Sequence, residues 1–132
     1  MRYVTRVLLL AAILVVAGCS LFRNPRVRIA YILSISAPDT VRADSAFTFT
    51  VDAELGHHSD FTLDHVDTDR SDSRFALRIW SRDISRQGYA VLWYCPDTNL
   101  TFEARPAEPG TFRIVAHQPD GSTREKTITV LP

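Results

Sequence analysis

The sequence predicts an all-β domain, a two-sheet sandwich of seven to eight strands that follows an N-terminal signal peptide. Apolar and polar residues alternate over short stretches, as they do in strands that bury one face. Turn-forming residues separate these stretches, and no stretch has the apolar spacing of a long helix. With 132 residues, the chain has room for a single domain, because compact domains usually contain about 100–150 residues.

Eight segments have the length and composition of strands. They span residues 27–36, 46–55, 61–68, 75–80, 89–94, 100–104, 111–117 and 123–131. The second is the most regular, because Phe47 and Phe49 fall on the face that must point into the core. Segment 89–94 is almost entirely apolar, which predicts a strand buried on both faces. Between the last two segments, Asp120 and Gly121 favour a tight hairpin turn.

Three segments resemble parts of bacterial immunoglobulin-like or fibronectin-like domains. Residues 37–51 resemble the stretch that leads into their second strand, residues 109–115 their penultimate strand and residues 122–130 their last strand. The resemblance implies an immunoglobulin-like sandwich over residues 27–132. It bears on the fold and says little about function.

The beginning of the chain has the layout of a signal peptide. Arg2 and Arg6 flank its start, and no polar side chain interrupts the apolar and small residues of segment 7–18. A helix that crosses a bilayer needs about 20 apolar residues, so this shorter run favours a cleaved signal over a permanent span.

The run ends in Val16, Ala17, Gly18 and Cys19, which resembles the lipobox of bacterial lipoproteins. The resemblance implies that a signal peptidase recognises the three residues before Cys19 and removes residues 1–18. It also implies covalent lipid, acyl chains such as palmitate, on Cys19; no other cofactor is expected. An ordinary secretory signal with an incidental cysteine is the alternative.

The mature chain is then expected to be anchored to a cell membrane, outside the cytoplasm. Residues 19–26 form a lipidated tether in this interpretation. Two or three acyl chains make detachment negligible, since each buried CH2 contributes about 0.8 kcal/mol. Ser20 stands where the resemblance implies no signal for retention in the inner membrane, so the outer membrane is expected in a Gram-negative cell.

The second cysteine, Cys95, has no intramolecular partner if Cys19 carries lipid. We expect it to be a small buried apolar residue, with an intermolecular disulfide as the alternative. The cysteine pair that joins the sheets of antibody-type domains is absent. Packing alone must therefore stabilise the domain, and Trp80 or Trp93 is expected to fill the space between the sheets.

A polar loop carries the strongest candidate for a metal site. His57, His58 and Asp60 lie close to His65 in the sequence, so three of the chain's four histidines are clustered. Imidazole and carboxylate groups together suit zinc or copper. A solvated loop and a polar strand face are the competing interpretation, because the usual zinc-ligand spacings are absent.

Two other candidate binding features follow this loop. Segment 67–72 has oxygen ligands at alternating positions, as calcium loops do, but it lacks their glycine and glutamate, so local ion pairs are favoured. Trp80 would form an exposed aromatic platform for a sugar with Tyr89, Trp93 and Tyr94. Core filling is the favoured role for these aromatic residues, because Trp93 and Tyr94 adjoin in a segment that looks buried.

Charge and motifs limit the classes of function. The chain has 15 basic and 15 acidic residues, so it has no field of one sign that would gather nucleic acid, and no nucleic-acid partner is expected. It has no nucleophile elbow, phosphate-binding loop or metalloprotease histidine pair, so we predict no catalytic residue and no enzyme activity. We expect a non-catalytic interaction or structural module with a protein partner in the cell envelope. A ligand-binding module for a metal ion or a glycan is the alternative.

Overall fold

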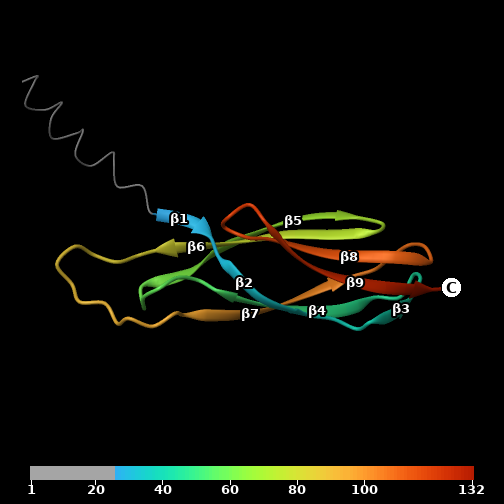
Figure 1. Ribbon diagram of the computed structural model, residues 1–132, viewed down its shortest axis with the longest axis horizontal. Helices are drawn as coiled ribbons and strands as arrows, with labels where there is room; N and C mark the ends of the chain where they lie inside the picture. Colours follow the sequence, from blue (N-terminus) through green and yellow to red (C-terminus); the bar gives the residue numbers. More distant parts are fainter. Residues whose placement is uncertain (1–25) are drawn as a thin grey trace, which may run out of the picture.

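A computed structural model describes residues 26–132, which form two β-sheets (Figure 1). The strands are β1 (Arg26–Ile29), β2 (Tyr31–Ser36), β3 (Thr40–Arg42), β4 (Phe47–Glu54), β5 (Phe61–Ser71), β6 (Arg74–Asp83), β7 (Asp97–Ala104), β8 (Gly110–His117) and β9 (Thr123–Leu131). The all-β prediction is confirmed, although nine strands exceed the expected seven to eight. Within residues 26–132, no helix is long and apolar enough to cross a membrane. The predicted signal peptide and the lipidation site at Cys19 lie outside the described residues.

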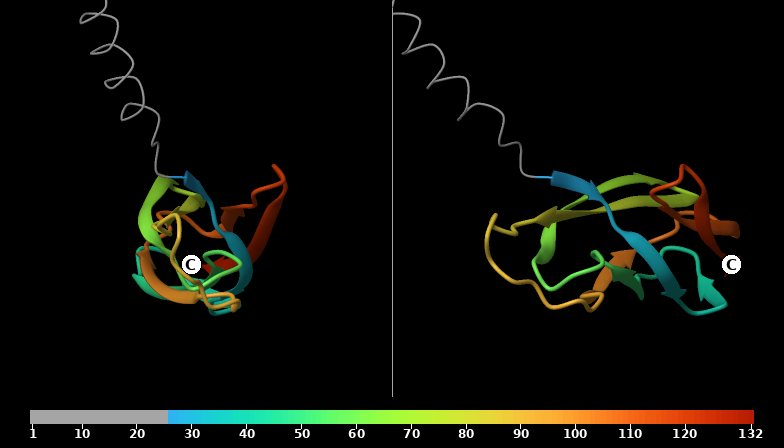
Figure 2. Two further views of the ribbon diagram at one scale, coloured as in Figure 1. Left: turned by 90° about the vertical axis from the view of Figure 1, so that its left-hand side faces the viewer. Right: turned by 60° about the vertical axis from the view of Figure 1, so that its left-hand side comes forward.

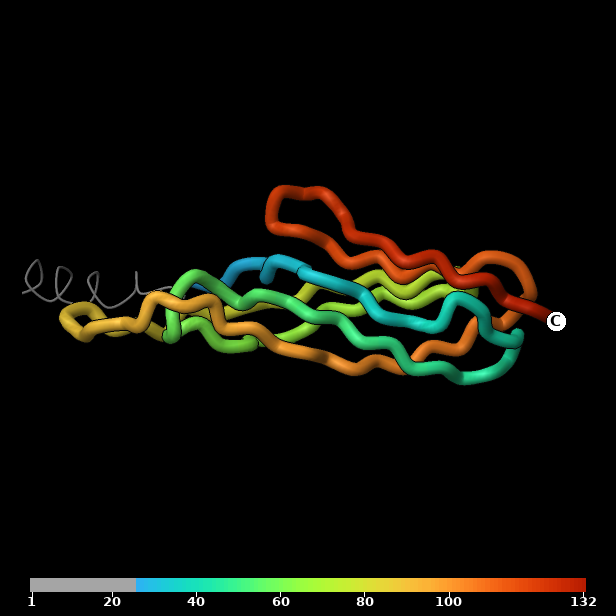
Figure 3. Tube along the Cα trace, turned by 60° about the horizontal axis from the view of Figure 1, so that its bottom comes forward, coloured from blue at the N-terminus to red at the C-terminus, as the bar shows by residue number. Residues whose placement is uncertain are grey.

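The two sheets differ in size. The larger has the order β1-β6-β8-β9-β3, with β5 also paired to β6, and the smaller has the order β2-β4-β7. Two pairs, β3 with β9 and β6 with β8, are parallel, and the others are antiparallel. The Cα trace in Figure 3 shows the strands of both sheets running along the length of the molecule.

Phenylalanine side chains fill the space between the sheets. Phe47 and Phe49 are buried as predicted. The Phe49 ring packs edge-on against Phe75, with 5.0 Å between centroids, and stacks on Phe102 at 5.4 Å. The expectation of a tryptophan in this core is wrong, because Trp93 is exposed and Trp80 is only half-buried on the larger sheet.

The predicted strand 27–36 is divided at Ala30, where the chain passes from one sheet to the other. β1 pairs with β6 in the larger sheet and β2 with β4 in the smaller one. The buried Ala30 donates its N–H to the carbonyl of Ile79 at 2.8 Å. Beyond it, the buried Gln118 side chain accepts from the N–H of Ile32 at 2.8 Å and donates to its carbonyl at 3.0 Å. The Gln118 amide thus supplies the hydrogen bonds that a neighbouring strand would otherwise give to Ile32.

The prediction of a buried strand at 89–94 is wrong. These residues lie in the loop 84–96 between β6 and β7, and Tyr89, Leu92 and Trp93 are 73%, 69% and 78% exposed. β6 and β7 belong to different sheets, so the chain between them crosses from one layer to the other and does not extend along a strand edge. Cys95, predicted to be buried, is exposed in the same loop.

The hairpin predicted at Asp120 and Gly121 is confirmed between β8 and β9. Gly121 has a φ of 84°, which glycine adopts without steric cost. The Asp120 carboxylate accepts from the N–H of Ser122 at 2.9 Å and from its hydroxyl at 2.6 Å. These bonds fix the turn locally.

The two ends of the molecule are formed by different parts of the chain. β1 begins beside the end of β6, with Arg26 opposite Asp83, and the loop 84–96 starts directly after Asp83. We name this the loop end. Figures 1 and 2 show the last strand, β9, finishing at the opposite end, which we name the C-terminal end.

Candidate functional site

The loop end is built from two loops that are joined by hydrogen bonds. Loop 55–60 connects β4 to β5, and loop 84–96 connects β6 to β7. The N–H of Ser59 donates to the carbonyl of Leu92 at 2.9 Å, and the N–H of Leu92 donates to the Ser59 hydroxyl at 3.1 Å. Leu55 donates its N–H to the carbonyl of Pro96 at 2.7 Å. The exposed loop therefore has a fixed base.

Aromatic rings pack where the two loops meet. The His57 ring lies nearly parallel to Trp93 at 6.0 Å, and His58 meets Trp93 edge-on at 6.2 Å. His58 also packs against Phe61, at 4.5 Å between centroids. Gly56 makes this packing possible, because a Cβ there would lie 2.1 Å from the Phe61 ring.

Arg28 of β1 ties the beginning of the domain to this aromatic cluster. Its guanidinium carbon lies 3.9 Å from the centre of the Phe61 ring. Its Nη2 lies 3.2 Å from Nδ1 of His57. Because a guanidinium group only donates, Nδ1 of His57 is the acceptor in this bond.

His58 is buried, and both of its ring nitrogens face protein groups. Nδ1 accepts from the N–H of Asp60 at 3.3 Å, and Nε2 lies 3.6 Å from a carboxylate oxygen of Asp83. Burial raises the pKa of Asp83, but hydrogen bonds from Ser85 and the charges of His58 and Arg26 outweigh it, so the pKa lies below its ordinary value. His58 joins loop 55–60 to the end of β6.

The structure divides the predicted metal ligands into two places. His57 and His58 are neighbours, with 4.9 Å between ring centroids. His65 lies on β5, where its Nδ1 is 2.6 Å from a carboxylate oxygen of Asp64. Asp60 accepts a hydrogen bond from the Ser59 hydroxyl. Within the part of the chain that the structure describes, no group of three or more His, Cys, Asp or Glu side chains is arranged to hold a metal ion.

Trp80, the predicted binding-surface residue, lies on the larger sheet. Its Nε1 donates to Asp67 at 2.7 Å, and the His65 ring stacks on it at 5.6 Å and 13°. Its predicted partners Tyr89, Trp93 and Tyr94 belong to the loop end, and no aromatic contact among residues 26–132 joins them to Trp80. The four rings do not form one platform.

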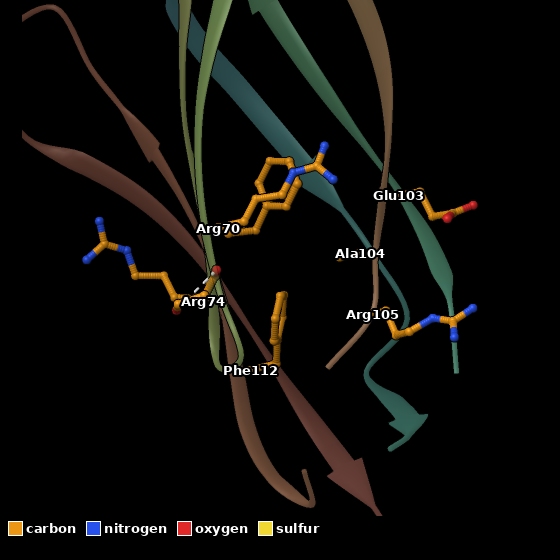
Figure 4. Close-up of a pocket in the computed structure, with 8 residues that line it drawn as sticks. Arg70, Arg74, Glu103, Ala104, Arg105 and Phe112 are labelled. Carbon is orange, nitrogen blue, oxygen red and sulfur yellow. Dashed lines mark hydrogen bonds between the residues drawn. The ribbon is translucent and has the colours of Figure 1, made fainter. Parts of the chain in front are cut away.

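A pocket of about 210 Å³ (Figure 4) lies at the start of β6. The end of β6, where the loop end begins, is at the other end of this strand. Its lining residues are Arg70, Ser71, Arg74, Phe75, Glu103, Ala104, Arg105 and Phe112. Figure 4 shows Glu103 and Arg105 extending to the side away from Arg70 and Phe112. Sequence reasoning missed this pocket, because its residues come from four strands and a loop that are far apart in the chain.

The chemistry of the pocket combines cations with aromatic rings. The Arg70 guanidinium carbon lies 4.7 Å from the centre of the Phe75 ring. Arg74 is 3.7 Å from the Asp69 carboxylate, the local ion pair expected for this turn. Guanidinium groups bind carboxylates and phosphates through paired hydrogen bonds, so the pocket suits an acidic group on a partly apolar partner.

The Cys95 thiol is poorly suited to nucleophilic chemistry. Loss of water around it raises its pKa, and the charge of Glu54 and a hydrogen bond to Glu54 raise it further. A higher pKa leaves less thiolate, the reactive form, at neutral pH. His117 lies at the end of β8. Burial lowers the pKa of His117, and the charges of Arg78 and Arg74 lower it further.

The chain was compared with family models, with curated proteins and with solved structures. None of the three comparisons found a match.

Proposed function

We propose that the chain is the precursor of a bacterial envelope lipoprotein whose domain is a non-catalytic interaction module. The signal peptidase cleaves before Cys19, and lipid on Cys19 holds the mature protein on a membrane. The lipobox-like residues Val16, Ala17 and Gly18 support this address. In a Gram-negative cell the membrane is the outer one.

The proposed function rests mainly on one observation. The chain enters the domain at the loop end, and the pocket lies toward the C-terminal end. β1 begins at Arg26, opposite Asp83 at the end of β6, whereas Arg74 of the pocket starts β6. Strands rise about 3.3 Å per residue, so roughly 30 Å separates the two places. A lipid at Cys19 therefore holds the loop end and leaves the pocket facing away from the membrane, toward an envelope protein.

We also place the domain in the immunoglobulin-like class. The two sheets with a shared core and the antiparallel set β2-β4-β7 support this assignment. The parallel pairing of β6 with β8 is a departure from purely antiparallel sheets. An experimental structure would test the strand order directly.

The anchor is tested with a matched pair of cysteine substitutions. Cys19→Ser is expected to move the protein from the membrane fraction to the soluble fraction, whereas Cys95→Ser leaves it on the membrane. Mass spectrometry of the parent protein is expected to find an N-terminal peptide that starts at acylated Cys19. A Cys19→Ser protein that stays on the membrane, with an unmodified Cys19 in the parent, would refute the proposal.

The interaction is tested at the pocket by charge reversal. Arg70→Glu is expected to abolish capture of the partner by chemical cross-linking in intact cells. Arg124→Glu on the exposed start of β9 is the matched control and is expected to retain it. Equal cross-linking in all three proteins would show that the pocket is not the contact.

A further inference from the structure

The loop 84–96 exposes several large apolar side chains. Five of its side chains are among the exposed large hydrophobic residues: Ile84, Tyr89, Leu92, Trp93 and Tyr94. Apolar side chains gathered on a protein surface mark contacts with proteins or membranes. The only charged residue within the loop is Arg86, and Asp83 and Asp97 stand directly before and after it.

The loop is held in place where it meets the domain. The hydrogen bonds between Ser59 and Leu92 fix its middle, and the N–H of Ile84 donates to the carbonyl of Asp60 at 2.9 Å. The Trp93 ring rests on His57 while most of its surface stays exposed. The aromatic side chains are therefore presented by a supported loop.

The short segment between Cys19 and Arg26 limits the distance between this loop and a lipid on Cys19. Arg26 follows Cys19 by seven positions, and an extended chain spans at most about 3.6 Å per residue, so the loop end lies within about 25 Å of a lipid on Cys19. The tether joins the domain beside Asp83, from which the loop starts.

We propose that the loop 84–96 inserts its aromatic side chains into the lipid headgroup layer of the membrane that carries Cys19. This inference rests on the proposed lipid anchor. Tryptophan and tyrosine favour this layer, because their rings are apolar and their N–H and O–H groups remain hydrogen-bonded to headgroups or water. Leu92 and Ile84 add apolar contact, and Arg86 can meet lipid phosphates. The loop thus sets the orientation of the domain, with its long axis away from the membrane.

The chain's two tryptophans allow a direct test. Trp80→Phe leaves Trp93 in the loop as the only tryptophan, and Trp93→Phe leaves Trp80 on the sheet as the matched control. The full lipidated protein is reconstituted in phosphatidylcholine and phosphatidylglycerol vesicles, with or without brominated acyl chains. We expect brominated lipid to reduce Trp93 emission about twofold and to leave Trp80 emission nearly unchanged.

A second measurement does not alter the aromatic residues. Once Cys19 is acylated, Cys95 is the remaining cysteine and can carry a polarity-sensitive fluorophore. Its emission is expected to shift to shorter wavelength in vesicles relative to the Cys19→Ser protein, which carries no lipid, in buffer.

The outcomes separate this inference from the proposed anchor. If the protein floats with vesicles, but brominated lipid does not quench Trp93 and the emission of the Cys95 probe does not shift, the loop does not enter the membrane and the anchor stands. If the protein neither floats nor carries lipid on Cys19, both proposals are wrong. If Trp93 is shielded in a concentration-dependent way without vesicles, a second copy of the chain covers the loop and the membrane contact is refuted.

Discussion

Gly56 lies against the Phe61 ring, and no side chain fits between them. A Cβ at this position would lie 2.1 Å from Cγ of Phe61. Arg28 and His58 cover that ring, so it has little freedom to move. We expect Gly56→Ala to lower the free energy of unfolding by about 1–3 kcal/mol, measured by urea titration.

Gly88→Ala is the control for this substitution. Nothing lies within 4 Å of a Cβ at Gly88, although its φ of 87° carries a conformational cost of about 1 kcal/mol for alanine. If Gly56→Ala destabilises no more than Gly88→Ala, the contact with Phe61 does not limit the site.

Gln118 satisfies two backbone groups of Ile32 that no strand pairs. Gln118→Leu leaves the N–H and the carbonyl of Ile32 without these partners in a buried place. We expect a loss of about 1–3 kcal/mol for each group left unpaired, and faster hydrogen exchange at the Ile32 amide. Gln87→Leu, the same change in the exposed loop, is expected to leave both measurements nearly unchanged. Equal effects of the two substitutions would contradict this role.

Single residues differ in how far the sequence predicts their place. The burial of Phe47 and Phe49 was predictable, because alternation along one strand decides which face is apolar. The role of Gln118 was not, because its partner Ile32 is 86 positions away. The histidines show the same limit: closeness in sequence does not make His57 and His65 meet, since β5 carries His65 along the sheet.

At the scale of elements, the loop 84–96 shows why an apolar run does not by itself predict a strand. A strand buried on both faces and a loop that presents apolar side chains have the same composition. They differ in whether neighbouring strands supply hydrogen bonds, which depends on distant parts of the chain. The division of 27–36 into β1 and β2 has the same cause, because both halves alternate well but pair in different sheets.

Leucine-to-alanine substitutions test whether segment 89–94 is an exposed loop or a buried strand. Leu77 of β6 is 1% exposed, and we expect Leu77→Ala to reduce the free energy of unfolding by about 2–5 kcal/mol. Leu92 is exposed, and Leu92→Ala in the Cys19→Ser protein is expected to change it by less than about 0.5 kcal/mol. Urea titration compares the two. Similar large losses would restore the interpretation of 89–94 as core.

At the scale of the whole molecule, turn spacing predicted two sheets but not their strand order. The hairpin of β8 and β9 was predictable, because its Asp-Gly turn is local. The parallel pairs β6–β8 and β3–β9 join strands that are not consecutive, so no turn sequence predicts these pairings. The same non-local pairing creates the pocket at the start of β6.

Acid sensitivity is a property of the whole fold, because several carboxylates are stabilised in their charged form. These carboxylates, whose pKa values lie below the ordinary 3.8, belong to Asp39, Asp52, Asp64, Asp83 and Asp120. For Asp64, the hydrogen bond from Arg82 is the largest cause and that from His65 the second. A lowered pKa means that the unfolded chain binds more protons, so the stability is fully present above the ordinary pKa and is lost as the pH falls through the folded value.

Asp64→Asn tests this dependence at one carboxylate. We expect the substitution to lower the free energy of unfolding at pH 7 and to reduce its decline below about pH 4, because one carboxylate no longer takes up a proton on unfolding. Arg82→Gln removes the same ion pair from the other side, so it is expected to act in the same direction, and the double variant is expected to add little to either single one. Urea titrations from pH 7 down to acid compare the four proteins. An Asp64→Asn protein with the same acid slope as the parent would show that this pair does not couple folding to pH, and the decline would then belong to the other carboxylates.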